Sequence, residues 1–233
     1  MEAREPLRLQ LPDKMRVVDH AYHSLEEAIF TGKLRPGDRL IEQQVCVELQ
    51  VSRTTVREAL LMLERTGLVQ SLPRKGTFVT HLSPAAASDL CTARVLLEGY
   101  AIHAGFPRFN TKLFTELRRL TAEMNRCVLP RDVPRIMELD MAFHGLLVEH
   151  AQSPQLTELW SSLNGQMRAL YLYYLEHFGI TTPDRIVMMH ERLVDELSSQ
   201  DLLQAQRGVS AHYFSWNGTT NEMQPFLDLF VHR

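Results

Sequence analysis

Three segments in the first third of the chain carry apolar residues at helical spacing. Residues 16–31 and residues 41–49 each form one apolar face, and a third segment, which ends at Gly67, repeats the pattern. Two short apolar runs, residues 68–72 and 77–80, follow and have the length of strands. The pattern predicts three helices followed by a small β-hairpin.

The remaining sequence has the pattern of amphipathic helices. Ser83 and Pro84 open it, because serine caps a helix N-terminus and proline fits the first turn. The helical segments are residues 84–105, 111–128, 133–151, 154–178, 183–199 and 202–216. Each has an apolar face that needs a partner, so we expect a mainly α protein whose C-terminal part is an antiparallel bundle of six to seven helices.

Cations and hydroxyl groups are concentrated at the N-terminus of the third helix. Arg53, Thr54, Thr55 and Arg57 crowd its first turn, and either Ser52 or Thr54 can cap it. Guanidinium groups, hydroxyls and free backbone amides that point the same way suit the phosphates and base edges of DNA. The candidate DNA-binding residues of this turn are therefore Ser52, Arg53, Thr54, Thr55 and Arg57. The alternative is an ordinary solvated helix face.

A basic turn joins the two predicted strands. It contains Arg74, Lys75 and Gly76, and Thr77 begins the second strand. The order of helix, turn, helix and basic hairpin describes a winged helix-turn-helix, whose recognition helix enters the major groove of DNA. The expected domains are a flexible arm over residues 1–14, a winged helix-turn-helix over 15–82 and an all-helical domain over 83–233.

Charge in the first domain is clustered rather than abundant. Residues 1–82 hold 12 Lys and Arg against 11 Asp and Glu, and the whole 233-residue chain has a formal net charge of −3. DNA binding would therefore depend on the four cations that are expected on one face, Arg53, Arg57, Arg74 and Lys75.

Cysteine usage and the apolar runs bear on the compartment. The three cysteines, Cys46, Cys91 and Cys127, include no Cys-x-x-Cys pair, so we expect neither a disulfide framework nor a thiolate zinc site. The start of the chain lacks the apolar core of a signal peptide, and no apolar run approaches the length of a membrane span. These features predict a cytoplasmic protein without a membrane partner.

Four residues of the helical domain form a candidate metal site. Asp140 and His144 stand four residues apart, so their side chains leave the same face of one helix. His190 and His212 lie within the apolar patterns of two further helices, and we expect both to face inward. One carboxylate and three imidazoles suit one divalent ion per chain, such as zinc, nickel or manganese. The alternative is that each histidine is an ordinary hydrogen-bonded residue of the core or surface.

The first domain resembles the DNA-binding domain of the GntR family of bacterial transcription regulators. The matching runs, in order, are residues 33–42, 51–60, 67–69 and 75–79. Thr55 stands where proline is usual, and Cys46 where alanine is usual. Gln43 stands where some relatives place a further DNA-contacting arginine. The resemblance implies a homodimer that binds a palindromic operator in double-stranded DNA.

The second domain resembles the FCD effector domain of the FadR subfamily of that family. In its metal-containing members, an aspartate and three histidines at places that correspond to the four candidate ligands hold the ion. Residues 94–98 also match the Arg-x-x-Leu-Glu run of the first helix of that domain, where the arginine helps to bind a carboxylate. The resemblance implies that Arg94 binds a small carboxylate effector. The alternative for Arg94 is a surface ion pair with Glu98.

The expected function is that of a transcription regulator, not of an enzyme. We expect repression that is relieved by a small organic acid bound beside the metal, and activation is the other sign of regulation. Arg53 and Arg57 would bind phosphates or guanine edges, and Thr54 and Thr55 would fix the register on the DNA backbone, while the wing reaches the minor groove. Two alternatives stay open: a regulator that senses the metal itself, and a metal-dependent hydrolytic enzyme in the helical domain.

Overall fold

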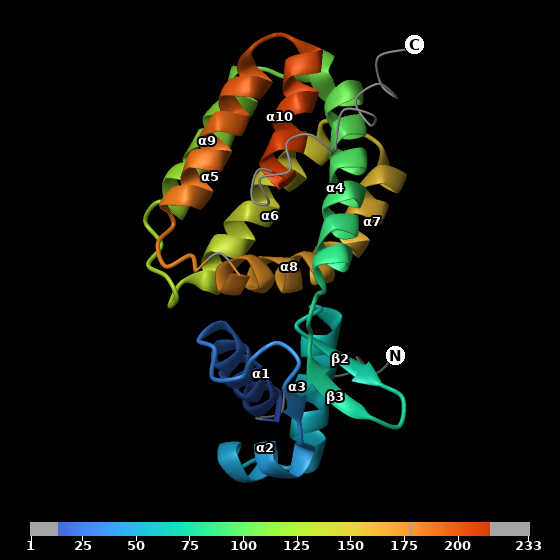
Figure 1. The fold of residues 1–233 in the computed structure, drawn as a ribbon, viewed down its shortest axis with the longest axis vertical. Helices are drawn as coiled ribbons and strands as arrows, with labels where there is room; N and C mark the ends of the chain where they lie inside the picture. Colours follow the sequence, from blue (N-terminus) through green and yellow to red (C-terminus); the bar gives the residue numbers. More distant parts are fainter. Residues whose placement is uncertain (1–13, 178, 215–233) are drawn as a thin grey trace, which may run out of the picture. The chain divides into compact units, whose positions relative to one another are not determined.

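The computed structural model describes residues 14–177 and 179–214, and the chain forms two compact units that divide between Val79 and Thr80 (Figure 1). The predicted fold class, a winged helix-turn-helix followed by a helical bundle, is confirmed. The arm expected over residues 1–14 lies outside the described residues, except that Lys14 begins the first helix.

The described part of the first unit consists of three helices and a three-stranded sheet. Its elements are α1 (Lys14–Phe30), β1 (Arg39–Leu40), α2 (Glu42–Leu49), α3 (Arg53–Arg65), β2 (Val69–Leu72) and β3 (Gly76–Val79). The strand order is β1-β3-β2, and both pairs are antiparallel. The predicted hairpin is β2 and β3. The third strand, β1, was not predicted, because two residues are too few to show an alternating pattern.

The apolar face of α3 packs against α1 and holds α3 in place. Val56 and Leu63 of α3 are fully buried, and α1 contributes Leu25 and Ile29 to the same core. The turn before α3 contains Gln50 with a left-handed φ of 55°. Because the apolar side of α3 is buried, its polar first turn is left on the outside.

The described part of the second unit is a bundle of seven helices. They are α4 (Pro84–Gly105), α5 (Thr111–Met124), α6 (Val133–Glu149), α7 (Pro154–Ser162), α8 (Asn164–His177), α9 (Asp184–Ser198) and α10 (Leu202–Phe214), with the 3-10 turn η1 (Phe106–Arg108) after α4. The side chains of Ser83, Asn110 and Ser153 cap α4, α5 and α7. None of the helices in the described ranges has both the length and the apolar character to cross a membrane.

One predicted helix is in fact two. The pattern predicted a single helix over residues 154–178, but α7 ends at Ser162 and α8 begins at Asn164. Serine and asparagine side chains hydrogen-bond to nearby backbone, so they favour helix ends over helix interiors. Figure 1 shows α8 running crosswise to the long helices. Residue 178 and residues 215–216, which end two predicted helices, lie outside the described residues.

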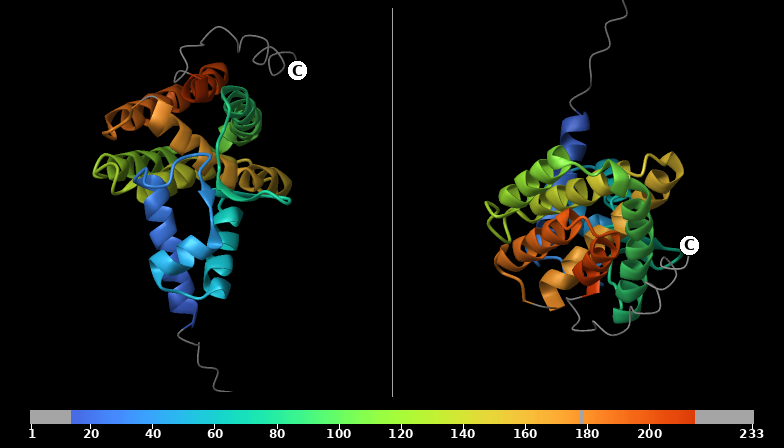
Figure 2. Two further views of the ribbon diagram at one scale, coloured as in Figure 1. Left: turned by 60° about the horizontal axis from the view of Figure 1, so that its bottom comes forward. Right: turned by 90° about the horizontal axis from the view of Figure 1, so that it is seen from above.

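Close packing brings α6, α9 and α10 around a common point. Helix α10 packs against α9, and α5 packs against α6 and α9, as Figure 2 shows for these neighbouring pairs. A Cβ added to Gly208 of α10 would lie 2.7 Å from the Cβ of Glu196 on α9, so this approach requires glycine. Gly208 stands one helical turn before His212, and its close contact therefore sets how near the His212 side chain comes to α9.

Candidate metal centre and DNA-binding surface

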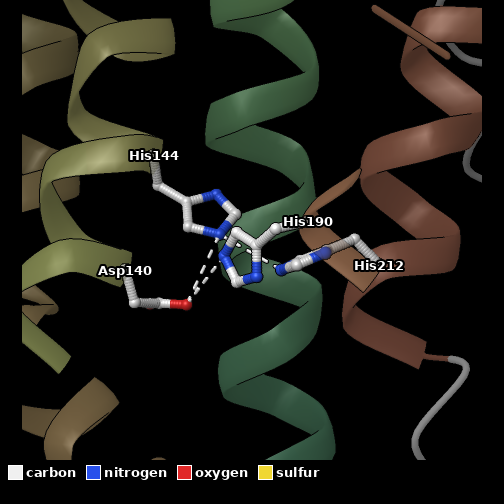
Figure 3. Close-up of side chains that lie close together, drawn as sticks. All are labelled: Asp140, His144, His190 and His212. Carbon is white, nitrogen blue, oxygen red and sulfur yellow. Dashed lines mark hydrogen bonds and ion pairs between the residues drawn. The ribbon is translucent and has the colours of Figure 1, made fainter. Parts of the chain in front are cut away.

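The four predicted metal ligands converge inside the bundle (Figure 3). Helix α6 supplies Asp140 and His144, α9 supplies His190, and α10 supplies His212. Their ligand atoms all lie within 4.8 Å of one another, and the three histidines are buried. The i, i+4 spacing and the inward faces expected for α9 and α10 thus meet at one place.

The atoms at the centre are close enough to share one ion. Nε2 of His144 lies 3.2 Å from Nε2 of His212. Oδ1 of Asp140 lies 3.1 Å from Nε2 of His190 and 3.9 Å from Nε2 of His144. One carboxylate oxygen and three imidazole nitrogens therefore face a common point.

Each histidine uses its outer ring nitrogen to hold its orientation. Nδ1 of His144 lies 2.7 Å from Oε2 of Glu98, and Nδ1 of His190 lies 2.8 Å from the carbonyl oxygen of Ile186. Nδ1 of His212 lies 3.5 Å from the carbonyl oxygen of Met189. Carbonyl oxygens only accept hydrogen bonds, so Nδ1 of His190 and His212 carries the proton. The inward Nε2 atoms of these two rings are then lone-pair donors.

These donors fit a divalent cation. The Nε2 atom of His190 is buried and has no hydrogen-bond partner among the described residues, and Oδ1 of Asp140 lies 3.1 Å from it. Nε2 of His144 and Nε2 of His212 lie 3.2 Å apart, and this contact is a hydrogen bond only while one of the two nitrogens carries a proton. A cation between the rings would replace that proton and give all three Nε2 atoms a partner. Imidazole with one carboxylate is a donor set that suits zinc, nickel or manganese.

Glu98 organises the side of the cluster that faces α4. Its carboxylate is fully buried and accepts hydrogen bonds from Trp160 Nε1 at 2.8 Å and from the Tyr213 hydroxyl at 2.7 Å, in addition to its contact with His144. Burial acts to raise the pKa of Glu98, but His144, Arg94 and the Trp160 hydrogen bond outweigh it and hold the pKa below its ordinary value. Glu98 is therefore an ionised acceptor that fixes the ring of one ligand.

The electrostatics of the cluster differ from ring to ring. Burial lowers the pKa of His212 first, and the neighbouring His190 and His144 lower it further, to well below its ordinary value. Burial also acts to lower the pKa of His144, but the Glu98 carboxylate outweighs burial and raises it. Burial acts to raise the pKa of Asp140, yet His190 and His144 hold it below its ordinary value. The α10 ring is thus kept neutral, as a metal ligand must be.

A pocket adjoins the cluster on its α8 side. It has a cavity volume of about 50 Å³, and the four cluster residues supply part of its lining. The apolar part of its wall comes from Met137, Met141, Met167, Leu170, Leu175, Ile180 and Ile186. Such a pocket, apolar with a few polar groups at one place, is typical of a site for a small ligand.

Arg53 and Arg57, the cations of the first turn of α3, are exposed, and each contacts a side chain of α2. Nε of Arg57 lies 3.0 and 2.9 Å from the two carboxylate oxygens of Glu42, and a guanidinium nitrogen of Arg53 donates to the side-chain oxygen of Gln43. Thr54 is also exposed. These side chains can exchange their contacts for phosphates or base edges at small cost, because exposed ion pairs contribute little.

The role expected for Thr55 needs correction. The Oγ atom of Ser52 accepts a hydrogen bond from the Thr55 backbone amide, which makes Ser52 the helix cap. The Thr55 hydroxyl lies 2.9 Å from the same oxygen, and Thr55 is only 4% exposed. Thr55 therefore supports the cap from inside instead of presenting its hydroxyl to DNA.

The wing presents a third cation that the sequence did not reveal. Arg74, Lys75 and Gly76 are exposed, and Thr77 is half-buried in β3. A Cβ added to Gly76 would lie 3.2 Å from Nε of Arg39, so the Arg39 guanidinium rests against the turn. The pairing of β1 with β3 makes this contact. Arg39 is 37 residues before Gly76 in sequence, and no spacing pattern would have joined them.

Two family models match the chain in the same order as the two units. The model described as "Bacterial regulatory proteins, gntR family" matches residues 17–79, and the model described as "FCD domain" matches residues 89–214, which is more than half of the chain. The chain belongs to the GntR family of regulators with an FCD domain. In this GntR regulator the first match contains α3 and the wing, and the FCD domain contains the whole candidate metal centre.

Similar proteins are transcription regulators. The uncharacterized HTH-type transcriptional regulator YdhC of Bacillus subtilis is 26% identical over 193 residues, which cover 82% of this chain and 85% of that protein. The HTH-type transcriptional repressor RspR of Escherichia coli is 26% identical over 208 residues, covering 87% of this chain and 88% of RspR. GntR membership therefore supports a regulator of transcription rather than an enzyme.

Solved structures share the fold. A GntR transcriptional regulator from Rhodococcus sp. RHA1 superposes with a TM-score of 0.62 at 24% identity, covering 94% of this chain and all of that one. Escherichia coli McbR/YncC superposes with a TM-score of 0.57 at 20% identity, covering 88% of this chain and 95% of the other. At these identities the likeness shows the arrangement of elements alone.

The alternative ion pair between Arg94 and Glu98 of this GntR regulator is present, but it is buried and not on the surface. Both Arg94 and Glu98 are fully buried, and the nearest atoms of the pair are 3.8 Å apart. The guanidinium donates to Oδ1 of Asn164 at 2.7 Å and lies 4.3 Å from the ring centre of Trp160. Its Nε and Nη1 atoms have no hydrogen-bond partner among the described residues. Arg94 is also absent from the described lining of the pocket.

Proposed function

We propose that this GntR regulator is a transcriptional repressor whose affinity for its operator is set by a small organic acid, bound beside a divalent metal ion in the FCD domain. The observation that supports this most is the cluster of one carboxylate and three oriented imidazoles within 4.8 Å. Two relatives support repression by their names: RspR of Escherichia coli and the gluconate operon transcriptional repressor of Bacillus licheniformis.

Asp140, His144, His190 and His212 would hold one metal ion per chain. A bound divalent cation supplies Lewis-acid attraction for a carboxylate. The apolar wall of the adjoining pocket would take the body of the acid and exclude water from the contact. The unpartnered buried nitrogens of Arg94 would add donors for the same anion after a side-chain movement toward the pocket.

DNA binding would use the first turn of α3 together with the wing. Arg53 and Arg57 would bind phosphates or guanine edges, and Thr54 would fix the register on the backbone. Arg74, Lys75, Gly76 and Thr77 of the wing, with Arg39 beside them, would follow the adjacent groove. Two chains related by a two-fold axis would bind the two halves of a palindromic operator in the cytoplasm.

Helix α4 is the element through which the two functions would be coupled. Four residues separate it from β3 of the wing, and its Glu98 holds the His144 ring of the cluster. A ligand that binds one arrangement of the cluster better than another would therefore bias the position of α4. A shift of α4 would change the spacing of the two winged domains in the dimer, and this change would alter the affinity for the operator.

The test begins with metal analysis of the purified full-length protein beside the variants His144→Ala and His103→Ala. His103 is an exposed residue of α4 and serves as the matched control. We expect about one metal ion per chain in the wild type and in His103→Ala, and little in His144→Ala. Operator DNA, selected by the protein from random sequence, is then titrated with each protein in the presence and absence of small carboxylic acids.

The outcomes separate the proposal from its alternatives. Weaker DNA binding on addition of an acid, only in metal-loaded protein, supports the proposal. A change in DNA affinity on addition of metal alone, with no acid effect, would identify a metal sensor. Turnover of an acid or ester by the wild type, lost in His144→Ala, would identify a metal-dependent enzyme. Absence of metal from both the wild type and His103→Ala would overturn the metal centre itself.

A further inference from the structure

The pocket beside the metal cluster is the proposed effector pocket. Its described wall contains three tyrosines, and the hydroxyl groups of two of them have hydrogen-bond partners in the protein. The Tyr213 hydroxyl donates to Oε1 of Glu98 at 2.7 Å. The Tyr174 hydroxyl lies 3.0 Å from Sγ of Cys91 and 3.5 Å from the carbonyl oxygen of Tyr213. The fold thus provides partners for two phenols that stand beside the cluster.

Tyr171 is the exception. It comes from α8 and lines the same pocket, and its hydroxyl oxygen is buried without a hydrogen-bond partner among the described residues. A buried hydroxyl with no partner destabilises a protein, because it has lost its hydrogen bonds to water. A bound ligand that forms a hydrogen bond with the Tyr171 hydroxyl would explain why this hydroxyl has no partner in the protein.

The Tyr171 hydroxyl can act only as a donor or a neutral acceptor. Burial raises the pKa of Tyr171 first, and the negative charge of Asp140 raises it further, so that it lies well above its ordinary value. The phenol therefore keeps its proton beside the metal centre. A protonated hydroxyl facing an anionic ligand donates its hydrogen bond to an oxygen of that ligand.

The surroundings of Tyr171 make this hydrogen bond selective. The neighbouring wall is formed mainly by methionine, leucine and isoleucine side chains, which offer no hydrogen bonds. Arg168 is the charged residue of the described wall outside the cluster. The cavity volume of about 50 Å³ further restricts the ligand to a small molecule. In an apolar wall, one correctly placed donor discriminates strongly between ligands that do and do not carry an acceptor.

We propose that Tyr171 is the specificity-determining residue of the effector pocket, and that its hydroxyl selects small carboxylic acids bearing a second oxygen function, a hydroxyl, keto or further carboxyl group, beyond the carboxylate that faces the metal. This inference rests on the proposed function, because it assigns the class of acid that the same pocket binds. It assigns to Tyr171 no part in holding the metal.

The experiment compares acids that differ by one hydroxyl group. Propionate with lactate, and acetate with glycolate, are titrated calorimetrically into metal-loaded full-length wild type, Tyr171→Phe and Tyr173→Phe. Tyr173 is on the same helix but is not among the described residues that line the pocket, so its variant is the matched control. Metal content and thermal midpoint without acid are measured for all three.

We expect the wild type and Tyr173→Phe to bind the hydroxylated acid of at least one pair about tenfold more tightly than its parent. In Tyr171→Phe this ratio should fall to about one, with affinity for the parent acid and metal content unchanged. Its thermal midpoint without acid should equal or exceed that of the wild type, because an unsatisfied hydroxyl has been removed.

Two results would overturn the inference alone. One is a Tyr171→Phe protein that keeps the preference for the hydroxylated acid. The other is a Tyr171→Phe protein whose midpoint falls without acid, since the hydroxyl would then have a structural partner. A metal-loaded wild type that binds none of the four acids would overturn the proposed function and this inference together, and it is distinguished by failing before any substitution is made.

Discussion

The proposed DNA-binding surface and the buried cluster hold their polar side chains in opposite ways. On the surface, Arg53 and Arg57 are exposed, and each is held by one side chain of α2. In the cluster, every imidazole has its outer nitrogen engaged and its inner nitrogen aimed at a common point. The surface can therefore adapt to DNA, whereas the cluster is preorganised and should be sensitive to any lost partner.

The largest effect should come from removing an inward ring. In His190→Ala, the metal that remains bound should fall well below one per chain, because the loss of one of four donors weakens metal binding. Metal analysis after dialysis measures this. His150→Ala should keep its metal, since His150 hydrogen-bonds to Leu146 and lies outside the cluster. Full metal content in His190→Ala would show that the ion binds elsewhere.

On the surface, the largest effect should come from Arg57. Arg57→Ala removes a cation from the first turn of α3 and should weaken operator binding by about 10- to 100-fold, as a lost base or phosphate contact does. Fluorescence anisotropy with a labelled operator measures the affinity. Arg65→Ala, at the other end of α3, is the control, and equal losses in the two variants would mean that only the overall charge matters.

A smaller but more telling effect should follow from Glu98→Gln. The amide keeps the shape but replaces one acceptor oxygen by an NH₂ group. Because His144, Trp160 and Tyr213 all donate to this side chain, the NH₂ group would face a donor and one hydrogen bond would be lost. Metal affinity should fall by about 10- to 100-fold, measured by competition with a chelator. Glu116→Gln removes an exposed carboxylate of α5 and should leave affinity unchanged. Unchanged affinity in Glu98→Gln would mean that the outer partner does not orient His144.

In protein from which a chelator has removed the metal, acid should lower the free energy of unfolding through His212. Its pKa in the folded protein lies well below the ordinary value, so below about pH 6.5 the unfolded chain binds a proton that the folded chain does not. The stability that this group contributes is complete above that pH and declines by up to about 1.4 kcal/mol per pH unit below it. Urea midpoints between pH 7.5 and 5.5 measure the slope, which His212→Gln should flatten. An identical slope in the variant would contradict this assignment.

The smallest effect is expected at Arg39. Arg39→Ala should weaken operator binding by a few-fold and lower the slope of log affinity against log salt concentration by about one, because it removes one phosphate contact. Titrations at several salt concentrations measure the slope. No change of slope would place Arg39 off the DNA and leave the wing to Arg74 and Lys75.

The sequence was most informative where function depends on local spacing. The spacing of Asp140 and His144 placed two candidate ligands on one face, and apolar periodicity indicated that His190 and His212 face inward. The winged fold followed from caps, glycines and short apolar runs. Spacing and periodicity also suggested that the four residues form one site, and the resemblance to known regulators strengthened this prediction.

Features that depend on tertiary contacts could not be predicted. The Glu98 carboxylate contacts donors on α6, α7 and α10, and the apolar pattern of α4 does not predict these contacts. Arg39 reaches Gly76 only through the pairing of β1 with β3. Thr55 has a polar side chain in a polar turn, yet its contact with Ser52 buries it. The unsatisfied hydroxyl of Tyr171 is visible only when the neighbours of all three pocket tyrosines are known.

The most direct measurement of the central claim is an anomalous difference map from crystals of the metal-loaded protein, collected at the absorption edge of the bound metal. We expect one peak per chain, enclosed by the Asp140 carboxylate and the Nε2 atoms of His144, His190 and His212, at about 2.0–2.2 Å from each. A peak at other side chains, or no peak between these four, would contradict it.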